Sequence, residues 1–137
     1  MGLDVSHDAF SGAYSAFNRF RQVVARATGG SYPPHEDGVV NPYGQPASWW
    51  WFGDGYHSKT HPGLFAFFMH DDCEGEIDPE TCRLLAGEME ALLPKIADVC
   101  SPSWGHIEAA GGFVAVARKW IAGCRAAAEE GVPLVFC

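Results

Sequence analysis

Three stretches of the chain repeat apolar residues every three or four positions, the spacing that places them on one face of a helix. They predict helices from Ser11-Gly12 to Gly29-Gly30, from Asp78-Pro79 to Pro94, and from Gly112 to Glu130. Each helix must bury its stripe against other elements, so the three share a core. The stripes are Phe10, Ala13, Phe17, Phe20, Val24 and Ala27; Cys82, Leu85, Ala86, Met89, Leu92 and Leu93; and Phe113, Ala117, Trp120, Ile121, Cys124 and Ala128.

Helix boundaries and short apolar segments complete the expected fold. Asp78 and Pro79 are typical of a helix N-terminus, Pro94 is expected to end or kink the second helix, and Gly131 is expected to stop the third. Strands are expected at Gly2 to His7, at Leu64 to Met69 as a central buried strand, and at Leu134 to Phe136. A polar turn is expected from Asp71 to Glu76. The prediction is an α+β fold: a small mixed sheet of three to four strands packed against three main helices.

Length and charge exclude several classes of protein. A chain of 137 residues suits a single domain, residues 1–137, with one core. The net charge of -8, with only nine scattered Lys and Arg, argues against general nucleic-acid binding or an anionic membrane surface. The longest apolar run is far shorter than the ~20 residues that span a bilayer. Five cysteines without a CxxC pair or a secretory signal predict reduced thiols and a cytoplasmic protein.

The segment from Gly29 to Pro62 is rich in Gly, Pro and aromatic residues and predicts a long irregular loop. Its rings, including Trp50, have two interpretations: they pack into the core, or they stack on a planar base and cover a pocket. In the second case Arg19, Arg21 or Lys59 would contact phosphate oxygens.

The segment His70-Asp71-Asp72-Cys73-Glu74-Gly75-Glu76 places a histidine, four carboxylates and a thiol between an apolar run and a helix. Carboxylates at such a position either cap the turn and the helix N-terminus or contact a ligand. An EF-hand is not expected, because a loop with Gly75 at its sixth position would have His70 first and Thr81 twelfth.

The segment Asp4-Val5-Ser6-His7-Asp8 lies at a second junction between a strand and a helix. Its polar side chains either cap the first helix or contact a ligand; adjacency in sequence does not make Ser, His and Asp a catalytic triad, which is recognised by geometry. If the two strands pair, His7, Asp8, His70 and Asp72 converge and form a possible transition-metal set, without any compact metal motif. No cofactor is expected, with a divalent metal as the alternative.

The stretches Gly2 to Phe10, Ser11 to Phe17 and His70 to Ile77 together resemble a family of small phage and prophage proteins. That family carries a Gly-Leu-Asp-x-Ser-His-Asp-Ala type motif and a central His-x-Asp-Cys-x-Gly-Glu type motif. Here Asp71 and Glu74 stand where the family usually has Ser and Asp. The resemblance implies a phage context, in which small proteins often counter host defence by sequestering or cleaving cyclic nucleotide or cyclic ADP-ribose signals.

Three functions are weighed. The first is a binding protein that sequesters a nucleotide-derived immune signal, either as one chain or as a homodimer. The second is a metal-dependent or acid-base phosphoester hydrolase acting on that signal, and the third is an inhibitor of a host protein. We favour the binding protein and expect the absence of a catalytic role. Its predicted ligand-binding residues are Ser6, His7, Asp8, Tyr14, Arg19, Trp50, His70, Asp72 and Glu74.

Overall fold

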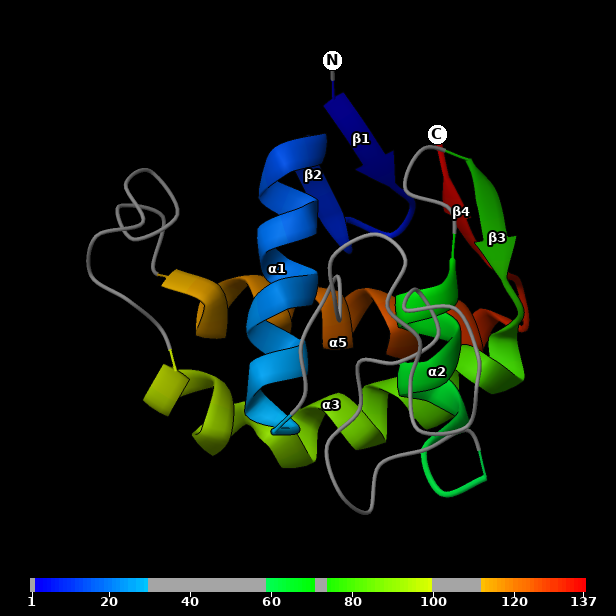
Figure 1. Ribbon diagram of the computed structural model, residues 1–137. Helices are drawn as coiled ribbons and strands as arrows, with labels where there is room; N and C mark the ends of the chain where they lie inside the picture. Colours follow the sequence, from blue (N-terminus) through cyan, green and yellow to red (C-terminus); the bar gives the residue numbers. More distant parts are fainter. Residues whose placement is uncertain (1, 30–58, 71–73, 100–111) are drawn as a thin grey trace, which may run out of the picture.

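The computed structural model describes residues 2–29, 59–70, 74–99 and 112–137. Its described helices are α1 (Tyr14–Ala27), α2 (Pro62–Met69), α3 (Pro79–Val99) and α5 (Gly112–Glu130), and its strands are β1 (Gly2–Val5), β2 (Phe10–Ala13), β3 (Gly75–Ile77) and β4 (Leu134–Phe136). Figure 1 shows α1 running across α3 and α5, with the sheet at one end of the helices. The α+β prediction is confirmed. No helix within the described ranges combines the length and apolarity needed to cross a membrane.

The strands form one sheet in the order β2-β1-β4-β3. All three pairings are antiparallel, so the predicted mixed sheet is wrong in this detail. A tight turn joins β1 to β2, which permits only antiparallel pairing. The helices α3 and α5 return the chain to the sheet beside β3 (Figure 1). Burial alternates along the strands, with Leu3, Val5, Phe10, Leu134 and Phe136 facing the helices.

The predicted first helix begins later than expected. Residues Phe10–Ala13 form β2, paired with Gly2–Val5, and the helix starts at Tyr14. Phe10 nevertheless belongs to the same apolar cluster, with its ring centroid 5.1 Å from that of Phe17. A strand residue on the inner face of the sheet thus continues the apparent helical stripe, which is why the sequence pattern extended the helix too far.

The predicted central strand Leu64 to Met69 is wrong, because these residues belong to helix α2. A short apolar run does not distinguish a buried strand from a buried helix, and Pro62 at the first turn favours the helix. The carboxylate of Glu88 on α3 accepts hydrogen bonds from the amides of Gly63 (3.1 Å) and Leu64 (2.9 Å). The helix N-terminus is therefore satisfied from another helix. The predicted polar turn is also partly wrong, since β3 begins at Gly75.

The second long helix does not end at Pro94, because α3 continues through it to Val99. Buried Leu92 and Ile96 lie on either side of the exposed proline, so tertiary packing holds the helix together where one backbone hydrogen bond is missing. The other boundaries are confirmed. The amide of Thr81 donates to Asp78 Oδ2 at 3.0 Å, and Gly131 has a φ of 70° after α5.

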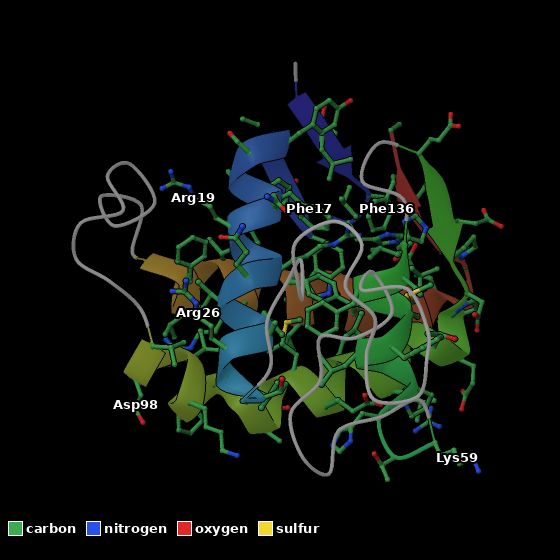
Figure 2. All side chains as sticks on the ribbon, in the orientation of Figure 1. Phe17, Arg19, Arg26, Lys59, Asp98 and Phe136 are labelled. Carbon is green, nitrogen blue, oxygen red and sulfur yellow. The ribbon has the colours of Figure 1, made fainter. Side chains whose placement is uncertain are left out.

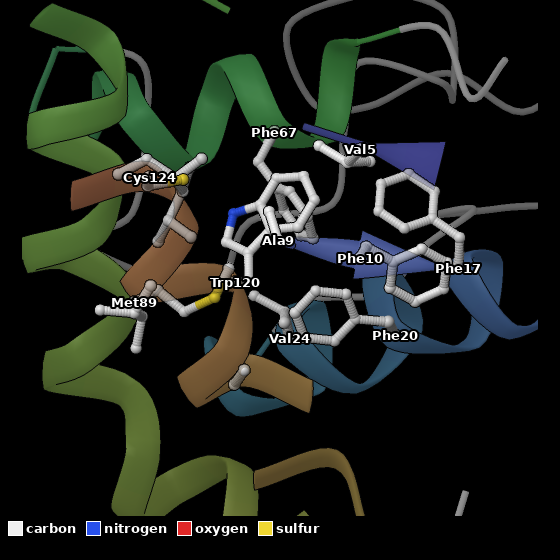
Figure 3. Close-up of a cluster of buried hydrophobic side chains, with 14 of the residues drawn as sticks. Val5, Ala9, Phe10, Phe17, Phe20, Val24, Phe67, Met89, Trp120 and Cys124 are labelled. Atoms are coloured by element: carbon white, nitrogen blue, oxygen red, sulfur yellow. The ribbon is translucent and has the colours of Figure 1, made fainter. Parts of the chain in front are cut away.

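The centre of the core is a group of aromatic rings contributed by four elements. The Trp120 ring of α5 lies 5.7 Å from Phe17 of α1, 5.2 Å from Phe67 of α2 and 5.8 Å from Phe136 of β4, measured between centroids. Figure 3 shows Trp120 in the middle of this group. Edge contacts of this kind add to the area that the rings bury. Phe136 extends the core to β4, the inner strand that lies between the two polar segments.

Candidate functional site

The two polar segments singled out in the sequence lie on either side of β4. The sheet order places β1, which leads into Ser6 and His7, beside one edge of β4, and β3, which follows Glu74, beside the other. Val5 pairs with Phe136, and Gly75 pairs with the same Phe136. The predicted pairing of a strand at Gly2 to His7 with a strand at Leu64 to Met69 is wrong, because helix α2 precedes His70. Instead, β1 and β3 each pair with β4, so the two segments lie on opposite sides of that strand.

The turn between β1 and β2 holds His7 in a defined position. His7 and Asp8 both have left-handed backbones, with φ of 60° and 57°, and the Ala9 amide donates to the Ser6 carbonyl at 3.2 Å. This is a type I′ hairpin turn, for which His-Asp is an uncommon choice because most such turns use Asn or Gly. Asp8 is exposed. The turn thus presents two polar side chains at a small cost in backbone strain.

The side chains of this turn reach two other elements. Ser6 Oγ lies 3.1 Å from His7 Nδ1 and accepts a hydrogen bond from the Val135 amide of β4 at 2.8 Å. His7 Nε2 lies 2.9 Å from Glu130 Oε2, at the end of α5. Sequence reasoning missed Glu130, because a position 123 residues further along the chain carries no local signal for this contact.

His70 on the other side of β4 is held by different contacts. Its ring stacks on Phe136 with 4.0 Å between centroids, and its Nε2 lies 3.2 Å from the Glu76 carbonyl oxygen. Its own carbonyl accepts a hydrogen bond of 2.6 Å from Arg21 Nη2. Because a carbonyl oxygen only accepts, the Glu76 contact requires the proton of the neutral ring on Nε2.

Arg21, considered from the sequence as one of three possible phosphate contacts, is instead a buried residue. Its side chain is only 3% exposed, and its guanidinium carbon lies 4.6 Å from the centre of the Phe17 ring. It places a positive charge at the C-terminus of α2, where the helix dipole favours a cation. Guanidinium groups commonly pack against aromatic rings. Arg21 and Arg19 are the same residue type, so it is their position on α1 that makes Arg21 buried and Arg19 exposed.

The other predicted residues are distributed as follows. Arg19 is exposed on α1, two positions from Arg21 and so on nearly the opposite side of the helix; Figure 2 shows it pointing away from Phe136. Tyr14 is half-buried at the start of α1, and Glu74 is exposed just before β3. Trp50 and Asp72 lie outside the described residues. The structure therefore groups Ser6, His7 and Asp8 on one side of β4 and His70 and Glu74 on the other.

Among residues 2–8, 74–77 and 130–137, the exposed charged side chains are all carboxylates. Asp4, Asp8, Glu74, Glu76 and Glu130 are exposed, whereas the nearby Arg21 is buried. Carboxylates accept hydrogen bonds from hydroxyl and amino groups. Within residues 2–29, 59–70, 74–99 and 112–137, no three His, Cys, Asp or Glu side chains are grouped so as to hold a metal ion.

Two thiols inside the fold are poor candidates for chemistry. Cys82 of α3 and Cys124 of α5 are both fully buried and hydrogen-bonded to each other. This hydrogen bond and burial raise the pKa of the Cys124 thiol well above its usual range. The same hydrogen bond lowers the pKa of the Cys82 thiol, but both side chains are fully buried and out of reach of a reagent, so the pair belongs to the packing of α3 on α5.

In comparisons with known proteins, no family model, curated protein or solved structure matches the chain.

Proposed function

We propose that the protein binds a small nucleotide-derived molecule at the two polar segments beside β4 and sequesters it. The signal would be a cyclic nucleotide or a cyclic ADP-ribose species in the cytoplasm of a bacterial host, and the role would be counter-defence. The choice of signal comes from the resemblance of the two segments to those of small phage proteins. The site itself is proposed from the structure.

One observation carries the proposal: each segment presents a histidine whose orientation is fixed before any ligand arrives. Glu130 and Ser6 hold His7, while Phe136 and the Glu76 carbonyl hold His70. A preorganised donor or acceptor loses little conformational entropy on binding, which favours affinity. Two such rings on either side of one strand suit a compact ligand that contacts both.

The charge around β4 limits the class of ligand. Exposed carboxylates at Asp8 and Glu74 suit the hydroxyl groups of ribose and the amino groups of bases, but they repel phosphate. Cyclic nucleotides carry one negative charge per phosphodiester, less than a linear triphosphate. Arg19 lies away from Phe136, so it contacts a phosphate only if the ligand extends along α1 (Figure 2).

The test is capture by the pure protein from a panel of cyclic nucleotides and cyclic ADP-ribose species, followed by removal of free ligand, denaturation and mass spectrometry. Intact ligand at a stoichiometric level is expected from the wild type. Loss of capture is expected in His70→Phe, which keeps a ring on Phe136 but removes the ring nitrogens. His61→Ala, at the start of α2, is the matched histidine control and should retain capture.

Other outcomes identify the alternatives. Recovery of a cleaved product would show that the protein hydrolyses the signal and does not sequester it. If neither ligand nor product is recovered and a pull-down yields one stoichiometric protein partner, the function is inhibition of a host protein. Equal capture by the wild type and by His70→Phe would show that the ligand does not bind at the segments beside β4. Sedimentation of the ligand-bound protein decides whether the site is formed by one chain or by a homodimer.

A further inference from the structure

Ser6, His7 and Glu130 form a continuous chain of hydrogen-bonding groups at the end of α5. Ser6 Oγ lies 3.1 Å from His7 Nδ1, and His7 Nε2 lies 2.9 Å from Glu130 Oε2. A hydroxyl, an imidazole and a carboxylate in this order are the components that activate a serine nucleophile. In the usual triad the histidine Nε2 faces the serine and Nδ1 faces the carboxylate. Here the ring is reversed, with Nδ1 toward Ser6 and Nε2 toward Glu130.

The contacts determine where the protons lie. The Glu130 carboxylate accepts, so the neutral imidazole carries its proton on Nε2 and leaves Nδ1 as an acceptor. Ser6 Oγ therefore donates its proton to Nδ1 and, at the same time, accepts one from the Val135 amide at 2.8 Å. A hydroxyl in this arrangement gives its proton to a base while a backbone donor stabilises the charge left on its oxygen.

Two features keep the chain in place. The turn is docked on α5 at Ala9, since a Cβ added to Gly123 would lie 2.5 Å from the Ala9 Cβ. Glu130 stands at the C-terminus of α5, whose last turn contains no basic residue. The negative end of the helix dipole repels the Glu130 carboxylate when no cation is near. The dipole and the carboxylate together would stabilise an imidazolium formed at His7.

The same turn offers donors for a developing oxyanion. The backbone amides of His7 and Asp8 follow Ser6 directly, and neither donates a hydrogen bond to any part of the chain that the structure describes. The amide of the residue after a nucleophile is a common oxyanion donor. Ser6 and His7 are partly exposed, with 18% of the His7 side chain accessible, so a small substrate reaches both.

We propose that Ser6 is the nucleophile of an acyl-transfer site that takes small carboxylic esters. Its Oγ attacks the ester carbonyl carbon while its proton passes to His7 Nδ1. The bond from that carbon to the alcohol oxygen then breaks, and the alcohol leaves with the proton from Nδ1. Water repeats the sequence on the acyl-serine, which releases the carboxylic acid and restores Ser6. Ser6 and His7 are catalytic residues, and Glu130 is a positioning residue.

This activity goes beyond the proposed ligand binding and is tested without any nucleotide, so that either proposal fails by itself. The full chain is treated with an alkyl fluorophosphonate, which forms a bond from phosphorus to serine oxygen as fluoride leaves. The modified peptide is located by mass spectrometry. Label on Ser6 is expected, and Ser11 is the internal control: its Oγ donates to Asp4 Oδ1 at 2.7 Å, with no imidazole.

Variants separate catalysis from structure. His7→Asn removes the base but suits the left-handed turn, and it should slow labelling at least ~100-fold while the melting temperature is retained. Glu130→Gln should slow labelling less and should shift the midpoint of the rate-versus-pH curve downward, because a neutral amide stabilises an imidazolium less. No label on Ser6, equal label on Ser6 and Ser11, or a wild-type rate in His7→Asn would each overturn the proposal.

Discussion

The two histidines beside β4 are held in contrasting ways. His7 belongs to a partly exposed turn and is oriented by polar side chains, with Glu130 59% exposed. His70 is oriented by packing: its ring lies on the core residue Phe136, and its carbonyl is bonded by the buried Arg21. Polar surface contacts contribute little to stability, whereas buried contacts contribute much. The His7 side should thus tolerate substitution in folding, and the His70 side should not.

The largest expected effect is at Gly63, which docks the helix that carries His70. A Cβ at this position would lie 2.4 Å from the Leu85 Cα, a backbone atom that does not move cheaply. We expect Gly63→Ala to lower the free energy of unfolding by about 3 kcal/mol in chemical denaturation.

Gly87→Ala, on the adjacent helix α3, is the matched control. A Cβ there meets nothing within 4 Å, so the change should stabilise the protein by about 0.5 to 1 kcal/mol. If both glycine variants unfold at the same denaturant concentration, α2 does not pack on α3 as described.

Removal of the buried cation should have the next largest effect. Arg21→Met fills similar space but leaves the His70 carbonyl without the 2.6 Å hydrogen bond and Phe17 without the guanidinium above its ring. A loss of about 2 kcal/mol in the free energy of unfolding is expected. Arg19→Met, on the exposed side of the same helix, is the control and should be nearly neutral; a similar loss in both variants would contradict the packed role of Arg21.

His7→Asn tests the polar side of the comparison. The variant loses the contact with Glu130, but Asn adopts the left-handed backbone of the turn more readily than His does. The free energy of unfolding should change by less than about 0.5 kcal/mol, as measured by chemical denaturation. A change as large as that of Arg21→Met would show that the two sides of β4 are held equally strongly.

The smallest effect concerns the cap that joins β3 to α3. Hydrogen bonds from the side chain and amide of Thr81 lower the pKa of Asp78 below its usual 3.8. Because the folded pKa is the lower one, the stabilisation is present above pH 3.8 and is lost as the pH falls through the folded value. Asp78→Asn keeps a capping side chain without this titration. Its stability should fall less than that of the wild type across the same acidic range; parallel curves would count against the cap.

Local features of the chain allowed some of the fold to be predicted. The Asp78 cap, the helix Gly112–Glu130 and the strand Leu134–Phe136 depend on neighbouring residues, and the structure confirms them. The strand predicted at Leu64 to Met69 is wrong, because the carboxylate that caps the helix comes from Glu88. The predicted helix end at Pro94 is wrong for a similar reason. Burial of Leu92 and Ile96 maintains α3 past a proline that would end a helix on local sequence alone.

The candidate site, like the fold, has features that near neighbours in the sequence determine and others that depend on contacts between distant residues. The sequence by itself determined the residue types of the two polar segments, the acidic charge and the apolar stripes that require an α+β core, because these are properties of near neighbours. Only the tertiary structure decided that β4 lies between the segments, that Glu130 is the partner of His7, and that Arg21 rather than Arg19 lies against His70. Those contacts join residues far apart in the chain, and their pairing follows from how the helices and strands pack.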